Sequence, residues 1–239
     1  MCIRDSTMIH NDKLYVSAMN GTFVMDLDTG EFKWLCRNAQ NFTIDKEDNI
    51  WIMIGTSLIR IKLADPDNQK KYFLPQYGIQ FEPKRIITTN SGDIYFVVLG
   101  GGLYRYDKQS DSFIHYSQRS GHLLSNYCYN VAETNSGELL VTSDKGITFL
   151  NPSNENTRFV TLGTNLPITS IADGCGILVC RNNELFVGGN DGLASFFRED
   201  LDQKEKNYSL YFSELYIHNK RIYPGVVSGG ILKDCLLYT

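Results

Sequence analysis

The chain repeats one pattern about five times: a polar turn, an apolar strand, a glycine, and a second strand that ends on a polar residue. The first apolar residue after each turn serves as an anchor. These anchors are spaced 36, 44, 45 and 46 residues apart and are Leu14, Ile50, Ile94, Leu139 and Leu185. A period of roughly 40 to 50 residues is typical of a four-stranded β-propeller blade. The repeat therefore predicts a propeller.

The strands within each unit are short blocks rich in Ile, Val, Tyr, Phe and Leu, and no window shows a helical period, so the fold class is all-β. The fourth unit is the plainest, with strands predicted at 127–133, 139–142, 147–151 and 158–162. A sheet of this size cannot bury both faces alone. Each blade must therefore stack on its neighbours.

One position of the repeat carries glycine in four units, just before the third strand, where the backbone needs a positive φ. These residues are Gly21, Gly102, Gly146 and Gly192, and Ser57 replaces glycine in the second unit. The first unit begins almost directly with its second strand. We therefore predict about five four-stranded blades forming an incomplete arc of a larger propeller, with apolar blade faces exposed at its ends. A closed small ring is the alternative, because propellers have 4 to 8 blades.

The pattern changes after Leu201. Residues 202–207 are charged and lack apolar anchors, residues 208–217 alternate as a strand, and residues 219–221 are predicted to form a turn. We predict two domains: propeller blades over 7–205, and the start of a β-sandwich over 206–239.

The composition excludes some partners. A net charge of -4 and a pI near 5.6 give no general attraction to phosphate backbones, so nucleic acid is not expected to bind. The sequence contains no run of ~20 apolar residues and no signal-peptide core at its start. Residues 1–6 and 235–239 resemble read-through from sequencing adaptors.

Metal and cofactor chemistry finds little support. The six cysteines lack the two-residue spacing of zinc or redox motifs, and free thiols are expected rather than a disulfide between Cys175 and Cys180. The four histidines lie in different units, without helical zinc-hydrolase spacing. The triplet at 100–102 joins two predicted strands, so it is not a dinucleotide loop. We predict no metal, no cofactor and no catalytic residues.

Three segments resemble the propeller repeats in the sensor region of bacterial hybrid two-component regulators. They are the Leu-Ser-Asn-Tyr opening at 124–127, the tryptophan-bearing strand at 48–56 and the Gly-Gly-Leu-Tyr-Arg-Tyr-Asp close at 101–107. Residues 210–222 look like the entry into the three-tyrosine β-sandwich that follows the propeller in this family. Tryptophan stands at its expected place only once, and the fifth unit carries an enlarged first hairpin at 173–183.

The resemblance implies a non-catalytic, periplasmic sensor segment of an inner-membrane histidine kinase. In the family this region recognises or relays a glycan-derived ligand, and the intact protein is expected to form a homodimer. The partners expected are an oligosaccharide, neighbouring blades and the sandwich. Asn126 and Tyr127 are the candidate ligand-binding residues, because an amide and an aromatic ring suit a sugar. The residues themselves favour a structural alternative, with Tyr127 packed between blades and Asn126 capping a turn.

Two other functions stay open. Some sugar-cleaving enzymes are propellers, and carboxylates such as Asp26, Asp107 and Asp173 could supply acid and base in a glycoside hydrolase or lyase. Most of these residues stand at turns, however, where aspartate is favoured for backbone hydrogen bonding. A protein-interaction scaffold also fits the period, although the tryptophan-aspartate dipeptide of one scaffold class is missing.

Overall fold

The computed structural model of the chain describes residues 6–18, 20–163, 166–201 and 215–222. The chain divides into two compact units, residues 1–201 and residues 202–239. The predicted boundary at 205/206 lies outside the described residues. Over the described ranges, the chain forms strands and two short 3-10 helices, η1 (Leu74–Tyr77) and η2 (Arg198–Leu201). The all-β prediction is confirmed.

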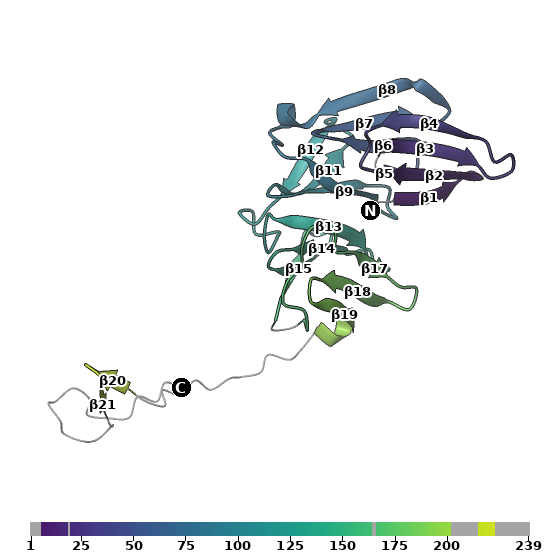
Figure 1. The fold of residues 1–239 in the computed structure, drawn as a ribbon. Coiled ribbons are helices and arrows are strands. Elements are labelled where there is room, and N and C mark those ends of the chain that lie inside the picture. Colours follow the sequence, from purple (N-terminus) through teal and green to yellow (C-terminus); the bar gives the residue numbers. More distant parts are fainter. Residues whose placement is uncertain (1–5, 19, 164–165, 202–214, 223–239) are drawn as a thin grey trace. The chain divides into compact units, whose positions relative to one another are not determined.

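The first unit contains five antiparallel sheets that follow one another in chain order (Figure 1). Blade 1 is β1 (Ser6–His10), β2 (Lys13–Ala18), β3 (Gly21–Asp26) and β4 (Phe32–Arg37); blade 2 is β5 (Asn41–Ile44), β6 (Asn49–Ile54), β7 (Ser57–Lys62) and β8 (Asp65–Phe73); blade 3 is β9 (Pro83–Thr88), β10 (Ile94–Val98), β11 (Gly102–Asp107) and β12 (Ser112–Tyr116); blade 4 is β13 (Cys128–Glu133), β14 (Leu139–Ser143), β15 (Gly146–Leu150) and β16 (Thr157–Thr161); blade 5 is β17 (Ile177–Val179), β18 (Glu184–Gly189) and β19 (Gly192–Phe197). The prediction of about five blades is confirmed, with three strands in the described part of the fifth.

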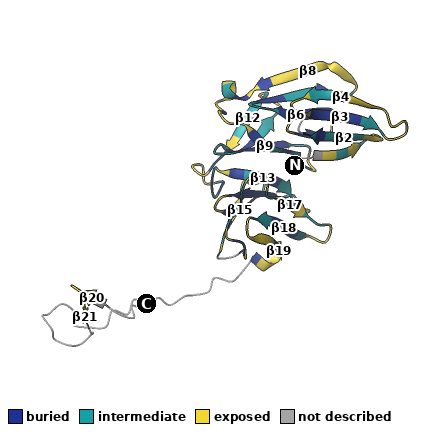
Figure 2. Cartoon of the chain, viewed as in Figure 1, coloured by how far each residue is buried: buried dark blue, intermediate teal, exposed yellow. Residues whose placement is uncertain are grey.

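The first strands of successive blades lie next to one another: β1 contacts β5, β5 contacts β9, β9 contacts β13, and β13 contacts β17. These strands form the inner side of the arc. The outer strand β8, in contrast, is almost entirely exposed (Figure 2). This radial order is that of a propeller.

Blades 2, 3 and 4 each contribute both of their faces to the core, whereas blades 1 and 5 contribute one face each. Four apolar clusters lie between successive blades, and the anchors Ile50, Ile94, Leu139 and Leu185 each point into the cluster shared with the preceding blade. The remaining anchor, Leu14, is the equivalent residue of blade 1. Its cross-strand row continues through Ile9, Met25 and Phe32.

That face of blade 1 stays open. Ile9 is 68% exposed and Phe32 69%, and Trp34 in the next row is 48% exposed. Side chains that pack against a preceding blade elsewhere in the chain therefore meet solvent here, as expected for an incomplete arc.

Two sequence predictions need correction. The first repeat does not begin with its second strand, because β1 supplies a first strand whose Ser6 pairs with Ser17. In the compact unit after residue 201, β20 (Leu215–Ile217) pairs with β21 (Lys220–Ile222). Their turn lies at His218 and Asn219, which both have positive φ, and not at 219–221.

Candidate functional site

The segment that carries Asn126 and Tyr127 joins blade 3 to blade 4. The Asn126 side-chain Oδ1 accepts a hydrogen bond from the backbone N–H of Gln118 at 2.7 Å, and its backbone carbonyl accepts one from Gly102 at 3.0 Å. Asn126 thus holds the loop in shape, as the structural alternative predicted. Whether its amide also contacts a ligand stays a prediction.

Tyr127 has a different environment. Its backbone N–H donates to Ser125 Oγ at 3.1 Å, and its carbonyl accepts from the N–H of Asp144 at 3.3 Å. These bonds fix the backbone, while the side chain remains 56% exposed. The ring is therefore not packed between blades and is free to meet a ligand.

A second exposed ring lies close to it. Phe81, in the segment before β9, is 57% exposed. A Cβ placed on Gly100 would lie 3.8 Å from the Tyr127 ring and 3.9 Å from the Phe81 ring, so both aromatics lie close to this glycine. Three segments far apart in sequence thus form one aromatic surface, which we call the Phe81–Tyr127 surface. Sequence reasoning found only Tyr127, because Phe81 lies outside the repeat.

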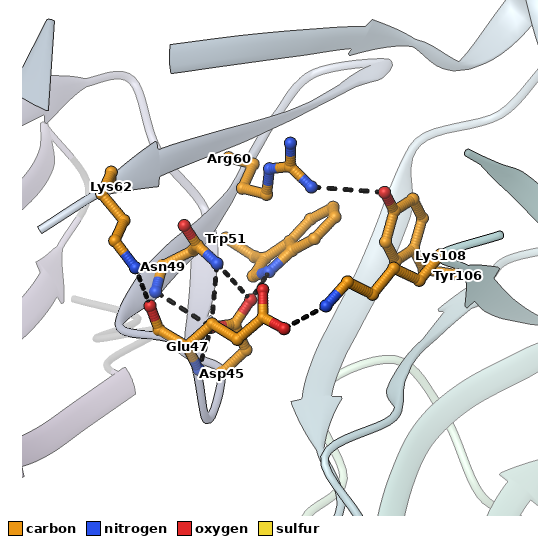
Figure 3. A network of polar contacts seen from close by, with 8 residues as sticks. All are labelled: Asp45, Glu47, Asn49, Trp51, Arg60, Lys62, Tyr106 and Lys108. Atoms are coloured by element: carbon orange, nitrogen blue, oxygen red, sulfur yellow. Dashed lines mark hydrogen bonds and ion pairs between the residues drawn. The ribbon is translucent and has the colours of Figure 1, made fainter. Parts of the chain in front are cut away.

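A polar network joins blades 2 and 3 at the strand ends opposite the Phe81–Tyr127 surface (Figure 3). Asp45 accepts hydrogen bonds from the indole Nε1–H of buried Trp51 at 2.8 Å and from the Asn49 side chain at 2.9 Å. Burial alone would raise the pKa of Asp45, but these bonds outweigh it and lower the pKa below its ordinary value. Glu47 forms an ion pair with Lys108 of blade 3.

Aromatic and hydroxyl groups extend this network outward. The rings of Trp51 and Tyr72 stack at 5.6 Å, and Tyr106 lies 4.7 Å from Trp51. Both tyrosine hydroxyls donate to Asp111, at 2.9 and 2.7 Å. Hydrogen bonds from Lys70, Tyr106 and Tyr72 lower the pKa of Asp111 to about 2. The sequence marked Trp51 as part of a repeat motif but gave no sign that Asp111 would meet both tyrosines.

The carboxylates of the enzyme alternative are not brought together. Asp26 accepts backbone N–H bonds from Asp28 and Thr29, and Asp107 does the same in the equivalent turn of blade 3. Asp173 pairs with Lys84 at 2.9 Å. Asp26 and Asp107 thus stabilise their own turns, and Asp173 pairs with a lysine of another blade, so the three carboxylates lie in different parts of the propeller.

Other sequence predictions can be placed as well. Cys175 and Cys180 are free and half-buried. The triplet 100–102 joins β10 to β11. Across the described ranges, no three His, Cys, Asp or Glu side chains gather as metal ligands. No helix among these residues is long and apolar enough to span a bilayer.

Comparisons with known proteins bear on the fold. No family model and no curated protein matches the sequence. Among solved structures, the extracellular domain of BT3049 from B. thetaiotaomicron, which is assigned as a hybrid two-component system, matches over 92% of this chain with a TM-score of 0.71 at 16% identity. The chain shares the fold of that extracellular domain. The resemblance inferred from the repeats is thus confirmed at the level of the fold, and the chain spans about a third (33%) of that structure.

Enzymes and secretion proteins share the architecture less closely. Virginiamycin B lyase from Staphylococcus aureus matches over 80% of this chain and 68% of its own length, with a TM-score of 0.58 at 16% identity. PorZ, a type-IX secretion component of Porphyromonas gingivalis, matches over 80% of this chain and 24% of its own length, with a TM-score of 0.55 at 16% identity. At these identities the comparisons establish the fold alone.

Proposed function

We propose that the chain is a non-catalytic, extracytoplasmic sensor segment of a hybrid two-component histidine kinase and response regulator. The observation that carries this proposal is the match to the BT3049 extracellular domain, which runs along 92% of the chain. In this role the propeller lies in the periplasm and recognises or relays binding of a glycan-derived ligand. The intact protein acts as a homodimer.

The Phe81–Tyr127 surface supports the glycan part of the proposal. Sugars present apolar C–H faces that pack on aromatic rings, and the two rings here are exposed and lie next to the same glycine. The backbone bonds of Tyr127 hold its position before any ligand arrives. A pre-ordered surface spends less binding free energy on ordering itself.

Calorimetric titration of the chain with neutral oligosaccharides tests the proposal. We expect binding that weakens about five- to tenfold in Tyr127→Ala, since one ring face of apolar contact is lost. The matched control is Phe159→Ala, which removes a 41% exposed ring from the outer strand β16 and should leave the affinity unchanged. Equal affinities in wild type and Tyr127→Ala would overturn the site assignment.

The alternative function is that of a propeller lyase or hydrolase, which the virginiamycin B lyase fold match favours. Incubating the chain with the same oligosaccharides and analysing products by mass spectrometry separates the two. Release of smaller sugars would replace the sensor proposal with an enzyme. The sensor proposal also expects the parent reading frame to encode an apolar span of ~20 residues and a kinase. A protein-interaction scaffold would show neither activity nor sugar binding.

A further inference from the structure

A cleft of about 410 Å³ opens between blades 2 and 3, at the opposite strand ends from the Phe81–Tyr127 surface. Its lining includes the β5–β6 turn at 45–47, the β9–β10 turn at 91–93 and the β11–β12 turn at 107–109. Trp51 and Tyr106 supply aromatic surface. The proposed function does not use this cleft.

The carboxylates of the cleft are already occupied by neighbours. Asp45 accepts bonds from Asn49 and Trp51, and Glu47 pairs with Lys108. Asp93 accepts from Ser91 Oγ at 2.6 Å, and Asp107 accepts from the backbone and hydroxyl of its own turn. The acceptor groups of the cleft are therefore largely satisfied from within.

Among the cations of the cleft, Arg60 and Lys46 are not matched in this way. Arg60 donates one hydrogen bond, to the Tyr106 hydroxyl at 3.3 Å, and its guanidinium lies 5.6 Å from the Trp51 ring centroid. A guanidinium has five N–H donors. Over the described ranges, neither Arg60 nor Lys46 has a carboxylate within ion-pair distance. The cleft thus offers surplus donors around satisfied acceptors.

We propose that this cleft binds an oxyanion, a carboxylate or sulfate group of a small ligand, with Arg60 as its principal donor. Arginine holds such planar groups with two parallel N–H bonds, and the aromatic face of Trp51 holds the guanidinium in place. Lys46, which also lines the cleft, adds a second positive charge. Because acids and bases are equal in number along the lining, selectivity comes from hydrogen-bond geometry and not from net charge.

The two tryptophans of the chain provide a direct readout. The Trp51 indole N–H lies at the cleft, whereas Trp34 is on the open face of blade 1 and serves as the internal reference. We would titrate ¹⁵N-labelled chain with sodium glucuronate, sodium sulfate and glucose at constant ionic strength. The expected result is a saturable shift of the Trp51 signal, with Trp34 unmoved and no response to glucose. Glucuronate and sulfate distinguish a sugar acid from a sulfate group as the preferred source.

Three variants make the test specific. Arg60→Gln should weaken the response at least about tenfold, which corresponds to the loss of a charge-assisted hydrogen bond. Lys46→Gln leaves the Arg60–Trp51 contact intact and should weaken the response to the anions less than Arg60→Gln does. The proposal therefore stays testable if Arg60→Gln folds poorly. Lys71→Gln, on exposed β8 of the same blade, is the matched control and should behave as wild type. No Trp51 response to either anion, or an equal response in Lys46→Gln and folded Arg60→Gln, would overturn the proposal.

Discussion

Blades 4 and 5 differ in one structural element, and the difference explains a feature of the repeat. Blade 4 has an outer strand, β16, that pairs with β15 along its whole length. In blade 5 the described residues continue from β19 into the short helix η2. Both third strands nevertheless begin with glycine, Gly146 and Gly192.

The surroundings of these two glycines are unlike. A Cβ on Gly146 would lie 2.1 Å from the carbonyl oxygen of Val160 in β16, an impossible distance, and the residue has φ +142°. A Cβ on Gly192 would meet nothing within 4 Å, although φ is +153°. In both blades the positive φ favours glycine at this position. In blade 4 the fourth strand also leaves no room for a Cβ. Gly21 in blade 1 and Gly102 in blade 3 show the same close carbonyl. Blade 2 carries Ser57 at this position, and its φ is not positive.

The largest effect is expected from placing alanine at these two positions. Gly146→Ala should lower the free energy of unfolding by about 4 kcal/mol or more, because both the positive φ and the Val160 carbonyl oppose a side chain. Gly192→Ala should cost only about 1 to 2 kcal/mol, from backbone strain alone. Urea unfolding followed by circular dichroism measures both. Equal losses would mean that the covering strand contributes no steric restriction.

The second comparison concerns side chains on the outer part of each blade. Val160 of β16 is fully buried in the cluster between blades 4 and 5, so Val160→Ala should cost about 1 to 3 kcal/mol. Leu193 of β19 is 64% exposed, and Leu193→Ala should change stability by less than about 0.5 kcal/mol. The same urea experiment serves for both. A large loss at Leu193 would show that this face is covered in solution.

The glycines also show how far the sequence could take the analysis. The repeat placed Gly21, Gly102, Gly146 and Gly192 at one structural position because positive φ is a local backbone property that residue type reports. The number of strands in the last blade is not local, since it depends on where the chain after Phe197 goes. β1 was missed for a similar reason: residues 6–10 carry little of the repeat, and only pairing with β2 makes them a strand.

The residues of the candidate sites also divide into those with local roles and those whose roles depend on distant segments. Tyr127 was found because it follows a repeat motif, whereas Phe81 and Asp111 acquire their roles from contacts with distant segments. No local pattern reports such a contact. The Asn126 side chain was predicted to cap a turn, and it does so by bonding to Gln118 within its own loop. Local roles were therefore predictable, and those that depend on packing between blades were not.

Hydrogen exchange should sharpen the contrast between the two third strands without any mutation. Amides on both edges of β15 are bonded to neighbouring strands, so they should exchange only by unfolding of blade 4. Amides of β19 that face away from β18 have no strand partner over the described residues and should exchange at least about a hundredfold faster. Comparable protection along both edges of β19 would reveal a covering strand.

A smaller effect is expected at the link that joins the end of blade 5 to blade 4. The Arg198 guanidinium contacts Glu138 at 3.1 Å and lies 4.9 Å from the centroid of the Phe149 ring. Arg198→Ala should lower stability by about 1 kcal/mol, most of it from the packing on Phe149. Arg198→Lys keeps the charge and should recover little of the stability that Arg198→Ala loses. If 0.5 M salt removed the whole difference from wild type, the ion pair and not the ring contact would carry it.

The smallest effect should come from Asp191, in the turn before β19. Its Oδ2 accepts hydrogen bonds from the hydroxyl and backbone N–H of Thr169, at 2.6 and 2.9 Å, and these bonds lower its pKa below the ordinary value. An acid whose pKa is lowered by folding adds stability above its unfolded pKa of about 4 and loses it as the pH falls through the folded value. Asp191→Asn should therefore melt slightly below wild type at pH 7, and the difference between the two melting temperatures should narrow as the pH is lowered below about 4. A difference that stays constant as the pH is lowered below about 4 would mean that the lost contact depends on shape and not on the carboxylate charge.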